Sequence, residues 1–137
     1  NVLATEKGIR SVLFSSYAGM QNPTPSRYLI NNSEVTSDVG FNSGGAENLT
    51  LSQLINFTWD ASLGTFQADV WAPCYRAIRD ANIVLENIDG VLTSDANKKI
   101  YAAEARFLRA YAYEVLYKWF GPVPLRTTTS SDPALAR

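Results

Sequence analysis

The sequence contains no histidine and a single cysteine, Cys74. The absence of histidine excludes acid–base catalysis by imidazole, Cys–His nucleophile pairs and His-based zinc sites. One cysteine can form neither an internal disulfide nor a thiolate zinc site. We therefore expect no metal site and no cofactor.

The sequence also lacks an excess of charge and any long apolar run. Its 12 Lys and Arg side chains nearly balance 13 Asp and Glu, which gives a formal net charge of −1. This balance argues against nucleic acid as a partner, since that would require a basic patch. No run approaches the roughly 18 apolar residues of a membrane span, and no signal peptide opens the chain.

The chain has 137 residues, enough for one compact domain, and it is rich in Trp, Tyr and Phe. It begins at Asn1 without a methionine and ends at Arg137, just after an apparent loop. We therefore expect residues 1–137 to be a single segment of a longer protein.

The stretch from Thr93 to Leu125 predicts one long helix over residues 94–120. Thr93 or Ser94 can serve as the N-cap, and Gly121 followed by a proline can end the helix. The helix is apolar around most of its circumference, so its neighbours must cover more than one side. We expect it to be the central helix of a stacked array, with some apolar face left exposed if the chain is only a fragment.

Two further helices are expected before it, at residues 5–21 and at about residues 66–89. Pro73 requires the second either to begin near Trp71 or to kink there. A short loop joins it to the long helix, so these two form an antiparallel hairpin. The fold class predicted is all-α: a TPR-like helical array with a long irregular loop region between the first and second long helices.

That loop region, residues 26–64, is where we expect a site, because long loops in compact domains are often functional. Residues 28–30 could form a short strand or an extended segment, and the leucines at 49–55 could form one or two helical turns. Aromatic rings beside carboxylates and amides suit sugar recognition. The candidate ligand-binding residues are Asp38, Phe41, Asn42, Trp59 and Asp60. The alternatives are that Trp59 packs the loop onto the helices and that Asp38 and Asn42 are turn formers.

Other prominent residues have structural interpretations. Asn82 lies on an apolar stripe and is expected to satisfy backbone groups of a loop, and Arg106 and Arg109 could anchor loop carbonyls or acids. Arg76 and Asp80, four residues apart, could form an exposed ion pair. The aromatic residues with helical spacing are expected in the core: Trp71, Tyr75, Phe107 and Tyr111.

Catalysis is not expected. A glycosidase needs two carboxylates about 5–10 Å apart across a cleft. Glu104 and Glu114 lie on one helix, about 15 Å apart along its axis, and cannot form that pair. Asp38, Asn42 and Glu47 do not match the spacing of EF-hand calcium ligands.

Two motifs resemble a known family. Residues 103–113, AEARFLRAYAY, followed by residues 119–125, WFGPVPL, resemble the EARFLRA and YFG-VPL signature of SusD/RagB proteins. The pattern formed by Trp71, Tyr75, Ile78, Asn82 and Leu85 is similar to an upstream helix of that family.

The resemblance implies the N-terminal portion of a surface-exposed outer-membrane lipoprotein of Bacteroidetes. Such a protein captures nutrients, usually glycans, and associates with a SusC-like TonB-dependent transporter. Its lipid-bearing cysteine is absent from this chain, and Cys74 in mid-helix is no substitute. The alternative is a helical scaffold for protein–protein contact, with ligand binding elsewhere. An exposed Trp59 would favour sugar binding and a buried one the scaffold.

Overall fold

A computed structural model describes residues 2–21, 33–40, 49–60 and 67–130, and in these residues the secondary structure is helical. An isolated parallel bridge joins Thr5 to Leu92. The predicted all-α class is therefore confirmed for the described residues. The named elements are η1 (Val2–Ala4), α1 (Glu6–Gln21), α3 (Leu49–Ile55), the π-helical turn η3 (Gln67–Trp71), α5 (Ala72–Asn87), η4 (Ile88–Gly90) and α6 (Asp95–Phe120).

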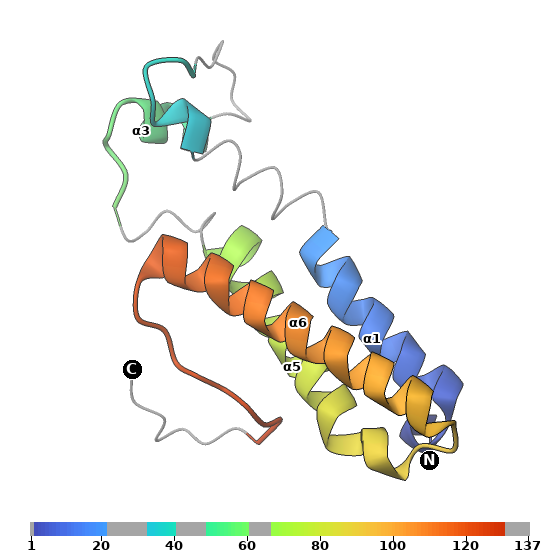
Figure 1. The fold of residues 1–137 in the computed structure, drawn as a ribbon. Coiled ribbons are helices and arrows are strands. Elements are labelled where there is room, and N and C mark those ends of the chain that lie inside the picture. The colour runs from blue at the N-terminus through green and yellow to red at the C-terminus, as the bar shows by residue number, and fades with distance from the viewer. Residues whose placement is uncertain (1, 22–32, 41–48, 61–66, 131–137) are drawn as a thin grey trace. The chain divides into compact units, whose positions relative to one another are not determined.

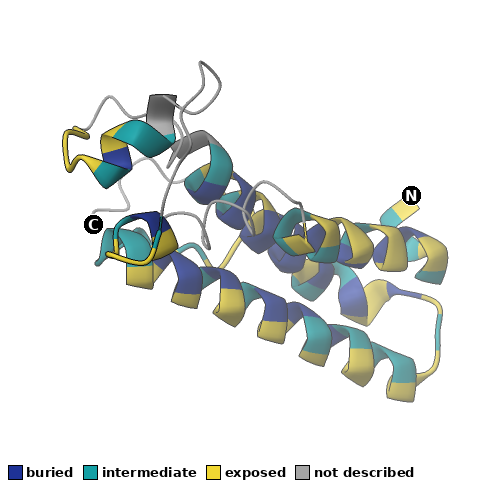
Figure 2. Cartoon of the chain, turned by 90° about the horizontal axis from the view of Figure 1, so that it is seen from above, coloured by how far each residue is buried: buried dark blue, intermediate teal, exposed yellow. Residues whose placement is uncertain are grey.

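The chain divides into two compact units, residues 1–20 with 74–137 and residues 21–73. In the first unit α1, α5 and α6 lie side by side, and α5 and α6 form the predicted antiparallel hairpin (Figure 1). Their facing surfaces are buried, while the outer surfaces are exposed (Figure 2). The core residues come from all three helices and the turn before α6: Ile9, Leu13, Ala81, Val84, Ile88, Val91, Ala102, Ala105 and Leu108.

Both ends of α6 follow the sequence signals. Ser94 is the N-cap, and its side-chain oxygen accepts a hydrogen bond from the Asn97 N–H. Gly121 adopts a φ of 69° at the other end, where its N–H donates to the Tyr117 carbonyl. α1 begins in a similar way, because the Thr5 hydroxyl accepts from the Gly8 N–H. The predicted ends of these two helices are confirmed to within a residue.

The second helix, predicted at about residues 66–89, consists of the consecutive elements η3, α5 and η4, which together span residues 67–90. α5 begins at Ala72, directly after the π-helical turn η3, and Pro73 therefore lies in its first turn. Proline has no N–H to donate, and it lies where the π-helical geometry of η3 changes to the α-helical geometry of α5. Of the two alternatives for Pro73, a helix start near Trp71 is the one that the structure shows.

The placement of Phe107 and Tyr111 in the core was wrong. Phe107 is 67% exposed and Tyr111 is 42% exposed, and Ile100 lies on the same open face. The buried face of α6 is instead formed by three alanines, which allow the neighbouring helices to approach closely, and three larger aliphatic residues: Ala102, Ala105, Leu108, Ala112, Val115 and Leu116. The expectation that an apolar face stays exposed is confirmed.

The Arg76–Asp80 ion pair was also wrong. Asp80 is buried with 3% of its surface exposed, and it pairs with Arg79, whose guanidinium lies 3.0 Å away. The Ser15 hydroxyl of α1 donates a second bond of 2.7 Å to Asp80. The buried Asp80 carboxylate needs hydrogen-bond partners near α1. It therefore pairs with Arg79 and Ser15, and the i,i+4 spacing to Arg76 did not predict its partner.

After α6 the chain crosses back over the hairpin as a segment that we call the strap (residues 121–130). Asn82 of α5 donates to the carbonyls of Arg126 and Thr128, each at 3.2 Å. Tyr113 contributes a further anchor, because its hydroxyl both accepts from the Arg126 N–H and donates to the Arg126 carbonyl. The predicted role of Asn82, a buried amide that satisfies loop backbone, is confirmed.

Candidate functional site

Phe57 and Trp59 form an exposed aromatic pair in the second unit. Their ring centroids lie 5.5 Å apart with an interplanar angle of 43°. Phe57 is 66% exposed and Trp59 is 42% exposed. Two tilted rings at the surface offer apolar faces of fixed orientation, which suits a ligand with C–H faces.

The end of α3 holds this pair in place. The Thr58 N–H donates to the Gln53 carbonyl, and the Phe57 N–H donates to the Leu54 carbonyl. These two bonds form a Schellman motif, whose C′ residue adopts the left-handed conformation. Phe57 occupies that position with a φ of 52°, where glycine is usual. The backbone here carries strain of about 1 kcal/mol or more, as expected for a bulky residue in this region.

The structure places the other sequence-predicted site residues as follows. Asp60 follows Trp59 directly in the chain and is exposed. Asp38 is exposed in the turn after residues 33–35, and no described hydrogen bond or ion pair joins it to the pair. Phe41 and Asn42 lie outside the described residues, as do residues 28–30.

The sequence-based site omitted Phe57, although this ring contacts Trp59. The sequence analysis did not predict where α3 ends. The turn at that end is what brings the ring of Phe57, at C′, against the ring of Trp59 two residues later. A single-sequence pattern of four leucine and isoleucine residues did not fix where that helix ends.

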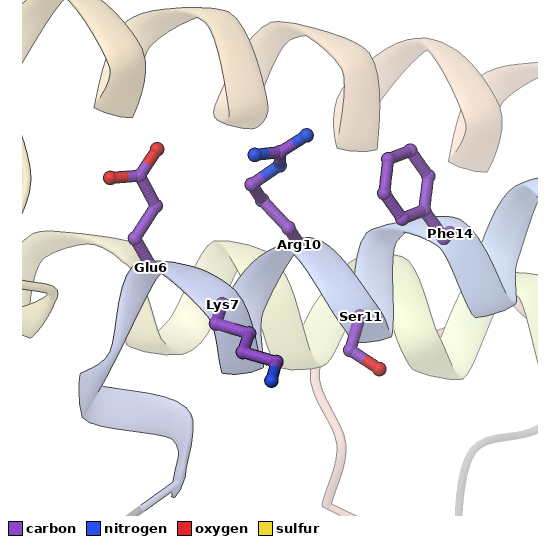
Figure 3. A pocket seen from close by; sticks show the side chains of 5 residues that line it. All are labelled: Glu6, Lys7, Arg10, Ser11 and Phe14. Carbon is purple, nitrogen blue, oxygen red and sulfur yellow. The ribbon is translucent and has the colours of Figure 1, made fainter.

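A second candidate is a hollow of about 590 Å³ along the open side of α1 (Figure 3). Glu6, Arg10 and Phe14 point to one side of the helix, and the Arg10 guanidinium carbon lies 5.7 Å from the Phe14 ring centroid. The Glu6 carboxylate accepts hydrogen bonds from Asn97 and Tyr101 of α6 and from Thr93, which precedes the N-cap of that helix. These bonds, the one from Tyr101 foremost, hold the pKa of Glu6 below its ordinary value. The acid in this hollow therefore joins α1 to the start of α6.

The described residues offer little reactive chemistry. Cys74 is fully buried, and burial raises the pKa of its thiol to about 11, so it stays protonated and unreactive at neutral pH. No group of three or more acidic or Cys side chains in the described part of the chain could hold a metal ion. No described helix combines the length and apolarity needed to cross a membrane.

Comparison with protein families identifies the chain. The model of a SusD-like family described as "Starch-binding associating with outer membrane" matches residues 4–137. The chain therefore belongs to the SusD-like family. The α5–α6 hairpin stacked on α1 agrees with the TPR-like array predicted from the sequence.

Among curated proteins, a SusD-like protein, P25, of Formosa agariphila is 37% identical over 62 residues. The alignment covers 44% of this chain and 12% of that relative, so the match spans about an eighth of the relative's length. No solved structure matches the chain.

Proposed function

We propose that this chain is the N-terminal, TPR-like segment of a longer outer-membrane lipoprotein that captures oligosaccharide at the cell surface. The captured ligand would pass to a SusC-like TonB-dependent transporter. One observation carries this proposal: the family match over residues 4–137, whose description names starch binding and the outer membrane. The function is binding, with no chemical step.

The exposed aromatic pair supports a ligand contact within this segment. Phe57 and Trp59 can lie against the C–H face of a sugar ring, and Asp60 can accept hydrogen bonds from its hydroxyls. The Schellman turn fixes one ring before ligand arrives, so little conformational entropy is lost on binding. Asp38, Phe41 and Asn42 remain proposed ligand-binding residues from the same loop region.

A helical scaffold for protein contact is the second candidate function. The observation that favours it is the open face of α6, where Ile100, Phe107 and Tyr111 are exposed. Large apolar side chains that follow one helix face are typical of a surface that packs on another protein element.

Titration calorimetry of the full-length protein tests the ligand contact and separates the two candidates. The ligands are malto-oligosaccharides and oligosaccharides from other plant and algal polysaccharides. We expect Trp59→Ala to weaken binding about tenfold or more, because loss of an aromatic contact removes on the order of 1.5 kcal/mol. Phe107→Ala is the matched control from the α6 face and should bind as the wild type does. Binding that is lost in Phe107→Ala and kept in Trp59→Ala would contradict the proposed site.

A further inference from the structure

A basic groove lies between the end of α5 and the first half of α6, within the first unit. It has a volume of about 440 Å³. Its lining combines the apolar residues Leu85, Ile88 and Ala102, the last 7% exposed, with four long basic side chains: Lys98, Lys99, Arg106 and Arg109. A methyl group between side chains of this length leaves a hollow at the helix surface. Asp89 is the one acid among the described lining residues.

The four basic side chains of this groove form no ion pair within the described residues, although Asp89 lines the groove and Asp95 precedes Lys98 and Lys99 by three and four residues. Lys98 donates to the Asp89 backbone carbonyl and Arg109 to the Asn82 side-chain oxygen, and both acceptors are uncharged. Lys99 and Arg106 make no hydrogen bond or ion pair with the described part of the chain. One turn away from Arg106, in either direction along α6, the sequence has three alanines and Arg109, with no acid.

This grouping is unusual in a chain whose basic and acidic residues nearly balance. The groove gathers four of the 12 basic side chains of a chain whose net charge is −1. Arg106 and Arg109, three residues apart on α6, repel each other, and no acid lies one turn from Arg106 to offset this. A cluster of basic side chains without ion pairs in a hollow is suited to hold an anionic group.

We propose that this groove binds the sulfate or carboxylate of an acidic saccharide. Arg106 supplies a planar fork of donors that matches either oxyanion, and Lys99 adds a mobile point charge. The inference rests on the proposed function and specifies it further, because it names the substrate class as anionic glycan. Lys98 and Arg109, held by their backbone and amide acceptors, frame the groove and keep its potential positive.

Affinity gel electrophoresis of the full-length protein tests the inference with three polysaccharides. Dextran sulfate and polygalacturonate carry the two anionic groups, and dextran is the neutral backbone of the first. The variant is Arg106→Gln. The matched control is Arg76→Gln, which removes the same charge from an exposed position on α5 that lies outside the groove.

We expect one polyanion to retard the protein, and the binding constant to fall about tenfold or more in Arg106→Gln alone. Which polyanion acts distinguishes sulfate from carboxylate, and the retardation should weaken as salt is raised. Equal effects of Arg106→Gln and Arg76→Gln, or no retardation by either polyanion, would overturn the inference. Binding of neutral glycans in a separate panel would then still support the proposed function, so the two failures are distinguishable.

Discussion

Arg109 of α6 donates a hydrogen bond of 2.8 Å to the side-chain oxygen of Asn82, which is buried on α5. The amide nitrogen of Asn82 is turned the opposite way and donates to the strap at the carbonyls of Arg126 and Thr128. One buried amide thus joins both helices of the hairpin to the segment that follows them. Tyr75 and Glu86 of α5 and Tyr113 of α6 also bond the strap, but Asn82 bonds α6 and the strap at the same time.

Asn82→Ala should destabilise the protein by about 1–3 kcal/mol, because it removes three hydrogen bonds of one buried amide: those to the carbonyls of Arg126 and Thr128 and that from Arg109. Urea denaturation measures the change in free energy of unfolding. Asn87→Ala is the matched control, since the Asn87 amide donates to the Ile83 carbonyl one turn back in its own helix. Equal losses in the two variants would argue against a special role for Asn82.

The contribution of Glu6 to the free energy of unfolding should depend on pH. Its pKa in the folded state lies below the ordinary value of 4.5, owing first to the hydrogen bond from Tyr101. The ionised carboxylate therefore stabilises the fold fully above about 4.5, and this contribution is lost as pH falls through the lowered pKa. The melting temperature of the wild type should exceed that of Glu6→Gln near neutral pH, and the gap should close on acidification. A gap that is constant from pH 7 to pH 3 would contradict this.

The adjacent residues Phe107 and Leu108 should respond very differently to truncation. Leu108 is 3% exposed in the core, so Leu108→Ala should cost about 2–5 kcal/mol. Phe107 points to the open face, so Phe107→Ala should change the stability of this chain by no more than about 0.5 kcal/mol. Thermal and chemical denaturation of the 137-residue chain measure both. A large loss in Phe107→Ala would show that this face is packed.

Phe57→Gly should separate stability from binding. Glycine adopts the left-handed C′ conformation without strain, so the variant should be more stable than Phe57→Ala by about 1 kcal/mol. Both variants lose the ring that contacts Trp59, and both should bind oligosaccharide more weakly than the wild type. Differential scanning calorimetry and titration calorimetry give the two quantities. Full binding by Phe57→Gly would exclude its ring from the site.

Local signals were enough to predict much of the fold. Ser94 and Gly121 marked the ends of α6, because residues of these types cap helices in few ways. Asn82 was assigned to loop backbone, because a buried amide on an apolar stripe needs hydrogen-bond partners. The choice of buried face on α6 could not be made in this way. Phe107 and Leu108 are both apolar, and which of them faces the core depends on where α1 and α5 lie.

The candidate site was predicted only in part for a related reason. Trp59 and Asp60 were chosen by their chemistry, and both prove to be exposed. Phe57 was omitted because its position depends on a left-handed backbone that composition does not reveal. Asp38, Phe41 and Asn42 stay predictions.

The central claim is glycan capture, and affinity gel electrophoresis of the full-length protein against starch and a panel of other polysaccharides tests it most directly. We predict retardation by at least one polysaccharide, and faster migration of Trp59→Ala than of Phe107→Ala in the same gel. Unretarded migration of the folded wild-type protein through every polysaccharide would contradict the claim.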